Sequence, residues 1–430
     1  MKNIFLLLFF LLSLAPLYSW TNHFIVSYFS LHGSEKLVKL PNVKVESFES
    51  FLKKEADGLA PLLEEIEQKS IETIPNYAKR PDGFVFDSKD KSNLRKNFLR
   101  SIRLNPKIKL ELFIQKLPNS KLNKSERLPT AKISIFENDE WMDRYFFQSI
   151  KEGGMVHPID IIASGADEPD YGHDIGLYTN NDTEHGKSYG FGTQPFGDPR
   201  KFYGSQAPFH MGFFHEAGIL YMAGGFIKRT HPLYRILLFR ELSKYAFKTG
   251  HEYWGYRFMG WGLHYIGDLT QPYHSTLSPG KTALGLISIN IRSMLGFKSA
   301  YEKEITRLSD RHTALEHYEY YLLEKIIKAN DLDSEYLNSF KDISNDKNYP
   351  GFSTSYPIDV LTKESNKRAD ELDEIIGESD SIMLFKDREV DFSKFKEDEN
   401  SKKVNEFLKI LFRSVGSHTR IYVDSLIKKE

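Results

Sequence analysis

The stretch Tyr253–His274 reads YWGYRFMGWGLHYIGDLTQPYH and combines a helical pattern with a chemical one. Apolar residues recur at helical spacing until Pro272, which ends the predicted helix. His264 and Asp268 are four residues apart, so the helix places an imidazole and a carboxylate on one face, one turn apart. His274 follows on the turn after the proline. Two imidazoles and a carboxylate that converge at a helix end are a suitable ligand set for zinc.

The neighbours of this pair favour a metal site. Phe258, Trp261 and Ile266 make the helix strongly apolar around His264 and Asp268. Burying an imidazole and a carboxylate in such surroundings is costly unless they are paired or bind a cation. The alternative is an ordinary buried helix that carries incidental polar residues.

A second histidine and carboxylate repeat the same spacing. His312 and Glu316 are four residues apart on a helix predicted over 301–329. Leu315, Leu322 and Leu323 occupy neighbouring apolar positions. His317 and Glu319 crowd the same segment, so a solvated helix face is the alternative to a metal site here.

Helical spacing dominates the chain, and the predicted fold class is mainly α. The predicted helices cover residues 20–31, 43–70, 233–247, 253–269, 301–329, 404–415 and 420–428. Two regions depart from this pattern. Residues 81–137 are rich in lysine and contain a strand-like run at 108–114, which predicts a mixed insertion. Residues 151–215 are rich in Gly, Asp, Asn and Pro, which predicts a long functional loop.

The overall composition limits the classes of function. The chain has 430 residues, of which 40% are hydrophobic and 27% charged, as expected for a soluble globular protein. Lys and Arg number 58 and Asp and Glu 59, so the net charge gives no general attraction to nucleic acid or anionic lipid. Any affinity for phosphate must come from a local site. The sequence has no cysteine, which excludes disulfides and thiolate metal ligands.

The first nineteen residues are typical of a secretory signal peptide. Lys2 precedes the apolar run Ile4–Leu14, and Ala15–Ser19 is a plausible cleavage region. The run is short for a bilayer-spanning helix, and an uncleaved anchor is the alternative. The expected localisation is therefore secreted or periplasmic.

The order His-x3-Asp, x5-His and then His-x3-Glu resembles that of the bacterial zinc-dependent phospholipases C and of their relatives, the fungal single-strand-specific nucleases. Those enzymes are mostly α-helical and hold three zinc ions in one cleft. Their first ligand is the amino-terminal Trp of the mature chain, and Trp20 follows Ser19 directly. His23 follows soon after, although the gap between these two ligands is longer in the relatives. The resemblance covers this N-terminal segment and residues 160–325.

Two further ligands, an Asp and then a His, are expected upstream of His264 by the same resemblance. The segment 164–171 supplies Asp167, with Asp170 as the alternative. The segment 207–216 supplies His210 and His215. The sequence favours His210 because it follows a loop and an aromatic residue, while His215 better matches the separation found in the relatives.

Two other histidines of the loop, His173 and His185, are interpreted as surface residues.

The resemblance implies three zinc sites. Their ligands would be Asp167, His210, His264 and Asp268 for the first, Trp20, His23 and Asp268 for the second, and His274, His312 and Glu316 for the third. Asp167 would also orient or deprotonate the attacking water.

The expected domains are a signal peptide at 1–19, a phospholipase C/nuclease-like helical domain at 20–330 with an insertion at 40–150, and a charged helical C-terminal extension at 331–430. The expected function is hydrolysis of phosphoric esters, with phospholipid as the first substrate class and single-stranded nucleic acid or nucleotide as the second. The nuclease relatives commonly contain disulfides, so the absence of cysteine favours the phospholipase side. A secreted helical protein with structural zinc is the non-enzymatic alternative.

The apolar run Ala283–Ile291 (ALGLISINI) is a candidate for transient contact with a membrane surface. A buried helix is the alternative. No obligate protein partner is indicated.

Overall fold

The computed structural model describes residues 22–121, 123, 125–136, 145–197, 203–386 and 389–427. The predicted signal peptide and Trp20 lie outside the described residues. The mainly α prediction is confirmed, because the described strands form only three two-stranded antiparallel sheets. None of the helices in the described ranges combines the length and the apolar character that crossing a bilayer requires.

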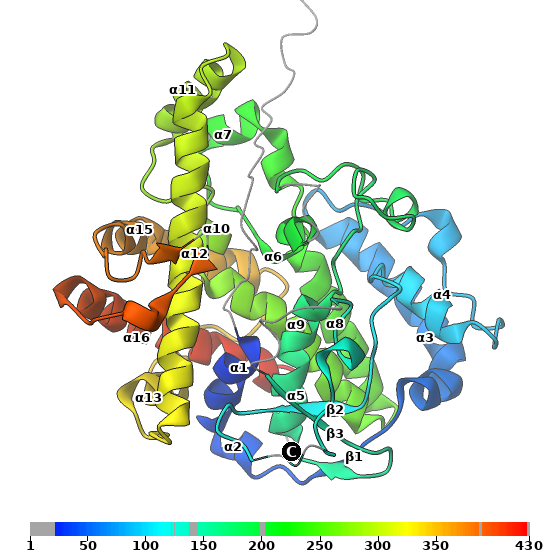
Figure 1. Ribbon diagram of the computed structural model, residues 1–430. Helices are drawn as coiled ribbons and strands as arrows, with labels where there is room; N and C mark the ends of the chain where they lie inside the picture. Colours follow the sequence, from blue (N-terminus) through cyan, green and yellow to red (C-terminus); the bar gives the residue numbers. More distant parts are fainter. Residues whose placement is uncertain are drawn as a thin grey trace, which may run out of the picture.

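Four helices form the centre of the molecule: α1 (His23–His32), α5 (Pro158–Asp167), α8 (Pro232–Lys248) and α9 (Glu252–Thr270). Helix α9 packs against both α5 and α8, and α1 packs against α5. In Figure 1, α12 (Ser299–Lys328) runs along one side of this centre, and α3 (Phe48–Thr73) lies on the opposite side.

The remaining α-helices surround this centre. They are α2 (Glu35–Val38), α4 (Leu94–Ser101), α6 (Ala207–His210), α7 (Gly218–Ala223), α10 (Pro272–Ser275), α11 (Ala283–Met294), α13 (Glu335–Lys341), α14 (Lys363–Lys367), α15 (Ala369–Gly377) and α16 (Glu399–Asp424). The paired strands are β1 (Val43–Lys44) with β4 (Met155–Val156), β2 (Phe113–Lys116) with β3 (Phe146–Ser149), and β5 (Phe385–Lys386) with β6 (Glu389–Val390).

Helix α9 is buried on every side. All of its residues from Tyr253 to Thr270 are shielded from solvent, which is the property of a central core helix. The helices predicted over 233–247 and 253–269 are confirmed as α8 and α9, and the turn between them contains Gly250 at a φ of 83°. The left-handed backbone at this turn suits glycine, which lets α9 fold back antiparallel to α8.

Helices α5 and α9 approach each other closely at two glycines. A Cβ on Gly165 would lie 2.9 Å from the carbonyl oxygen of Arg257, and a Cβ on Gly260 would collide with the carbonyl oxygen of Ile162. The absence of side chains at this crossing brings the backbone of α5 within reach of the polar side chains of α9.

A buried ion pair fixes the segment that follows α5. The 3₁₀ turn Glu168–Tyr171 continues directly from the helix, and Glu168 accepts hydrogen bonds from Arg257 Nε at 2.8 Å and Trp261 Nε1 at 2.9 Å. Both donors are on α9. Because a buried carboxylate must keep its partners, this pair holds the turn in one orientation on α9.

Two predictions of secondary structure differ from what is observed. The region 151–215 is not one long loop, because it contains α5. Only Asp160 of that helix escapes burial, so the sequence shows no polar face. The two helices predicted over 404–415 and 420–428 are one helix, α16. The helix continues through Gly416, where a Cβ would collide with the carbonyl oxygen of Phe340 in α13, so the glycine permits close packing of α16 on α13.

The mixed insertion predicted within the N-terminal third is not confirmed. Only Phe113–Lys116 at the end of the strand-like run forms a strand, and it pairs with Phe146–Ser149. Helix α16 in the C-terminal third packs against α1 and α9, so this part of the chain belongs to the same packed body as the central helices.

We expect Gly260→Ala to lower the free energy of unfolding by about 1–3 kcal/mol, because the added methyl group overpacks the contact between α5 and α9. Urea unfolding followed by circular dichroism measures this. Gly225→Ala is the control, since a Cβ there meets no atom within 4 Å, and it should change stability by less than about 0.5 kcal/mol. Equal stability of the two variants would contradict the close crossing.

Candidate metal centre

Side chains from six separate elements converge beside the buried end of α9. They are His23 from α1, Asp170 from the turn after α5, His210 from α6, His264 and Asp268 from α9, His274 from α10, and His312 and Glu316 from α12. All are buried except Asp170, which is partly buried. The sequence separations reach from residue 23 to residue 316, so the fold and not the local motif assembles the cluster.

The cluster divides into three groups whose ligand atoms lie within 4.8 Å of one another. The groups are His23 with Asp170 and His264, His210 with His264 and Asp268, and His274 with His312 and Glu316. These groups can hold metal ions.

Asp268 lies between the three groups. Its carboxylate oxygens are 3.4 Å from His23 Nε2, 2.9 Å from His210 Nδ1 and 3.8 Å from His274 Nδ1. A carboxylate in this position is within reach of more than one cation, which is the arrangement expected of a bridging ligand.

The buried donor atoms face one another in a way that a bound cation would stabilise. His264 Nε2 and His210 Nδ1 face each other at 3.0 Å, and both also face Asp268. Neither the Nε2 atoms of His23 and His274 nor the Asp268 oxygens have a protein hydrogen bond of good geometry. Buried polar groups normally have such partners. Several buried nitrogen and oxygen donors that point at one another without partners fit metal ligands.

Backbone carbonyls set the tautomers of two histidines. His264 Nδ1 donates to the carbonyl oxygen of Ala166 at 2.8 Å, and His274 Nδ1 donates to the carbonyl oxygen of His210 at 3.0 Å. A carbonyl can only accept, so the proton sits on Nδ1 and the Nε2 lone pair turns into the cluster. Outer contacts of this kind orient histidine ligands in metal sites.

A buried carboxylate lies behind His210. Asp174 Oδ2 is 3.6 Å from His210 Nε2, and Asp174 itself accepts hydrogen bonds from Arg235 at 2.6 Å and Tyr265 at 2.5 Å. Burial alone would raise the pKa of Asp174, but the charge of Arg235 holds this pKa below its ordinary value. Asp174 therefore stays ionised and orients the His210 ring so that Nδ1 faces Asp268.

Burial and mutual repulsion shape the ionisation of the cluster. Burial raises the pKa of Asp170 and that of Glu316 to about 7, and it lowers the pKa of His312 to about 3. Burial opposes the charge of His210 as well, yet the neighbouring Asp268 carboxylate raises the pKa of His210 to about 10. The Asp268 carboxylate thus keeps His210 protonated. A buried carboxylate that holds a proton on its neighbour in this way also attracts metal cations.

The structure places Asp170, and not Asp167, among the facing donors. Asp167 Oδ1 accepts from the backbone N–H of Phe24 at 3.2 Å, and Oδ2 accepts from Gln115 at 2.8 Å and Tyr171 at 2.9 Å. These bonds direct Asp167 toward the first turn of α1, where a carboxylate is favourable. Asp167 therefore positions the helix that carries His23.

The structure also separates the two candidates in the segment 207–216. His210 is in the cluster, whereas His215 Nε2 lies 3.0 Å from the carbonyl oxygen of Ile358 and 3.1 Å from Thr362 Oγ1. His215 thus contacts the turn of π-helix η9 (Pro357–Thr362) and not the metal groups.

The surface interpretation of His173 is wrong. This residue is buried, its ring centroid is 4.6 Å from that of Trp261, and burial lowers its pKa to about 3. His185, the other histidine interpreted in this way, is partly buried. The Gly- and Asp-rich composition around them indicates loops, but the loop at His173 packs against Trp261 of α9.

Glu319 is a buried acid that the sequence interpretation assigned to a possible solvated face. It lies one turn beyond Glu316 on α12, and its two oxygens have no hydrogen-bond partner among the described residues. Burial, and then the charge of Glu316, raise its pKa well above the ordinary value. The spacing of His312, Glu316 and Glu319 continues along one helix face, which is the sequence signal that could have identified it.

Comparison of this chain with protein-family models, with curated proteins and with solved structures found no match. The interpretation of the site therefore depends on its own geometry and chemistry.

We expect Asp170→Asn to weaken metal binding by about tenfold or more, a loss typical of altered metal-site contacts. Asp167→Asn should keep the metal and instead destabilise the protein by about 1–3 kcal/mol, because it disturbs buried hydrogen bonds. Metal content after dialysis against a buffered divalent cation, and urea unfolding, distinguish the two effects. Loss of metal from Asp167→Asn but not from Asp170→Asn would contradict the arrangement.

Proposed function

We propose that this protein is an exported, zinc-dependent phosphoric ester hydrolase of the phospholipase C kind. The observation that carries the proposal is the position of Asp268 between three groups of buried imidazole and carboxylate donors. Such nitrogen and oxygen sets, without thiolates, suit zinc. Separate groups that share a carboxylate favour several ions held close together, as in multinuclear phosphoesterases.

Three zinc ions are assigned as follows. His210, His264 and Asp268, with Asp170, hold the first, and His274, His312 and Glu316 hold the third. The second is held by His23 and Asp268, together with the amino terminus of the mature chain at Trp20, which the resemblance to the zinc phospholipases implies. Export to the periplasm or the medium, with cleavage before Trp20, is part of the same proposal, and sequencing the amino terminus of the exported protein tests it.

Zinc bound here would polarise a phosphoryl oxygen and activate water for attack at neutral pH. The chain's own residues orient the ligands and the attacking water. The carbonyl oxygens of Ala166 and His210 hold two imidazoles in the ligating tautomer. Asp170, the most exposed member of the donor set, is the carboxylate best placed to contact the attacking water. This role replaces the one expected for Asp167, whose oxygens are occupied by protein donors.

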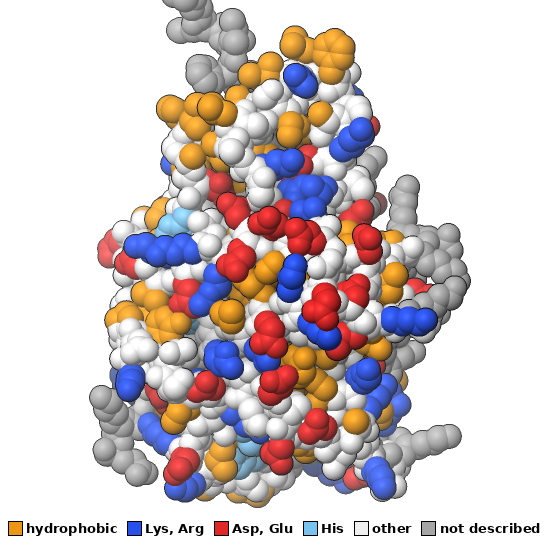
Figure 2. Space-filling view, turned by 90° about the vertical axis from the view of Figure 1, so that its left-hand side faces the viewer, with side chains coloured by type: hydrophobic (Ala, Val, Ile, Leu, Met, Phe, Trp, Pro, Cys, Tyr) orange, Lys and Arg blue, Asp and Glu red, His pale blue; other side chains and the backbone are white. Residues whose placement is uncertain are grey.

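An apolar surface at one end of the molecule supports a lipid substrate. We define the apolar tip as residues 217–229 and 282–298, which include α7 and α11. More than half of the large hydrophobic side chains that are exposed in the described residues belong to it: Ile219, Met222, Leu284, Ile291, Met294, Leu295 and Phe297. Figure 1 shows α7 and α11 together at one end, and Figure 2 shows hydrophobic side chains gathered there with Lys and Arg beside them.

The charge of the apolar tip suits an anionic membrane. Its two segments contain Lys228, Arg229, Arg292 and Lys298 and no Asp or Glu. The helix predicted to touch lipid, Ala283–Ile291, lies within α11, where only Leu286 and Asn290 are buried. A partly exposed apolar helix with basic flanks favours an interfacial position in lipid headgroups, and this observation favours phospholipid over nucleic acid as the substrate.

The function is tested by hydrolysis assays of the full mature chain with stoichiometric zinc. We expect cleavage of phospholipid into diacylglycerol and a phosphorylated head group, loss of activity on chelation, and recovery with added zinc. Asp268→Asn should remove more than one zinc per chain and abolish activity, whereas His312→Ala should remove one.

Other results of the same assays would replace the proposal. Zinc-dependent cleavage of single-stranded nucleic acid without cleavage of phospholipid would support the nuclease alternative. Tightly held zinc without hydrolysis of any phosphoester would support a structural site.

We also expect Leu295→Ser with Phe297→Ser to lower activity on anionic phospholipid vesicles by about tenfold, because two exposed apolar anchors are lost. Activity on a soluble short-chain phosphodiester should not change. Val85→Ser with Ile343→Ser is the matched control, since both residues are exposed but lie outside the apolar tip. Equal losses on vesicles and on the soluble substrate would show that the tip acts on folding and not on membrane contact.

A further inference from the structure

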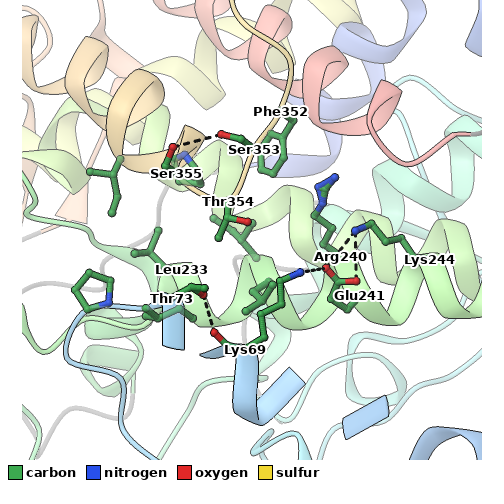
Figure 3. A pocket seen from close by; sticks show the side chains of 16 residues that line it. Lys69, Thr73, Leu233, Arg240, Glu241, Lys244, Phe352, Ser353, Thr354 and Ser355 are labelled. Carbon is green, nitrogen blue, oxygen red and sulfur yellow. Dashed lines mark hydrogen bonds and ion pairs between the residues drawn. The ribbon is translucent and has the colours of Figure 1, made fainter. Parts of the chain in front are cut away.

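A cavity of about 390 Å³ lies between the end of α3, one face of α8 and the segment 352–358. Its volume is within the range of about 300–1,000 Å³ that small-molecule sites occupy. None of the residues that line it belongs to the candidate metal centre. Figure 3 shows these side chains around the opening.

The floor and walls of the cavity are apolar. Leu233, Ile236 and Leu237 on successive turns of α8 face it, and Phe352 lies on the opposite wall. Ile74, Pro75, Pro357 and Ile358 complete this lining. An apolar concave surface of this kind accommodates a hydrocarbon chain or ring.

The rim of the cavity carries an excess of positive charge. Lys69, Arg240 and Lys244 line it with a single carboxylate, Glu241. Glu241 accepts from Lys69 at 2.8 Å and from Lys244 at 3.1 Å, so its negative charge is already shared by two lysines. Figure 3 shows Lys69 of α3 and Lys244 of α8 both in contact with Glu241 of α8.

Arg240 is the cation that remains without a carboxylate. Its guanidinium lies 4.9 Å from the centroid of the Phe352 ring and forms no ion pair with any described residue. Burial, and then repulsion by Arg240, lower the pKa of Lys244. An anion between the two would relieve this repulsion, since opposite charges nearby favour the ionised form of each lysine and arginine.

Three hydroxyl residues line the cavity across from α8. Ser353, Thr354 and Ser355 follow one another on the segment across from α8, and Ser353 Oγ lies 3.4 Å from Ser355 Oγ. All three are exposed to solvent. Hydroxyls of this kind can donate to the oxygens of a carboxylate or phosphate.

His215 stabilises this wall. Its ring nitrogen contacts the carbonyl oxygen of Ile358 and the hydroxyl of Thr362, where the π-helix η9 begins and ends. The segment that bears the three hydroxyls therefore continues into a turn that His215 holds in place. This contact helps to fix the position of the cavity wall.

We propose that this cavity binds an amphipathic anion, with its apolar chain or ring on α8 and Phe352 and its carboxylate or phosphate head group between Arg240 and the Ser353–Ser355 hydroxyls. The site is separate from the proposed hydrolase function and does not require it. A free fatty acid and an alkyl phosphate share the chemistry that the cavity recognises.

Isothermal titration calorimetry of the zinc-loaded full chain tests the proposal with decanoate and decyl phosphate below their micelle concentrations. We expect at least one of the two to bind with one site per chain. The neutral decyl glucoside and the chain-free acetate should each bind at least about tenfold more weakly, because they lack one half of the recognised chemistry. Decanoate against decyl phosphate identifies the preferred head group.

Variants locate the bound anion. Arg240→Gln should weaken binding by about tenfold, as expected for a lost charge-assisted hydrogen bond. Thr354→Trp, on the exposed rim, should block the cavity without disturbing the core. Arg292→Gln, an exposed arginine of the apolar tip, is the matched control and should bind normally. Thermal unfolding confirms that each variant is folded.

Three outcomes with the unmodified chain and the cavity variants would overturn the proposal, and a fourth comes from the metal centre. The first three are absence of saturable binding by both anions, equal binding of the neutral glucoside, and unchanged binding by Arg240→Gln and Thr354→Trp. Asp268→Asn separates this site from the metal centre, because it disables the centre but leaves the cavity intact. Loss of the anion from Asp268→Asn would place the binding at the metals and contradict the proposal, whatever the result of the hydrolysis assays.

Discussion

The carboxylate of Asp268 is completely shielded from solvent, and the arrangement of the central helices depends on what compensates its charge. An unpaired carboxylate in the interior carries a large desolvation penalty. Burial alone would raise the pKa of Asp268, but the neighbouring imidazoles of His264 and His210, of which His210 is the protonated one, keep it well below the ordinary value. The imidazoles that surround it come from α1, α6, α9 and α10, so these elements must meet at one point. Glycine at the crossing of α5 and α9 permits that approach, because any side chain there would push α5 away.

A second set of buried charges holds the donors in position. Asp174 with Arg235 lies behind His210, and Glu168 with Arg257 holds the turn that bears Asp170. Buried ion pairs contribute little net stability, since desolvation offsets most of their attraction. Their geometry is nevertheless restrictive, because each guanidinium must keep its partners. We interpret both pairs as determinants of donor placement, with stability supplied mainly by the apolar packing around α9.

The sequence predicted the parts of the site that local spacing determines. His264 with Asp268 and His312 with Glu316 each lie one helical turn apart, and both helices form as predicted. Spacing could not decide which of Asp167 and Asp170 faces the metal ligands. The α-helix ends at Asp167 and a 3₁₀ turn follows, so the direction of each side chain depends on the tertiary contacts of Glu168 and not on spacing. Helix α5 escaped prediction because burial on nearly all sides removes the polar face that periodicity detects.

The balanced composition conceals a strong separation of charge in the folded chain. The formal net charge is only -1, yet the carboxylates Asp170, Asp268 and Glu316 gather in the candidate metal centre. The apolar tip carries only cations, and the cavity on α8 carries more cations than anions. Salt screens electrostatic attraction beyond a Debye length of about 8 Å at physiological ionic strength. The charge of each local surface, and not the net charge of the chain, therefore determines which ligands are attracted to it. The buried imidazoles and carboxylates of the interior form groups that can hold a metal cation, while the apolar tip and the cavity each place basic groups beside apolar surface. That combination suits an anion with a hydrocarbon part, which is the ligand chemistry that we propose for both surfaces.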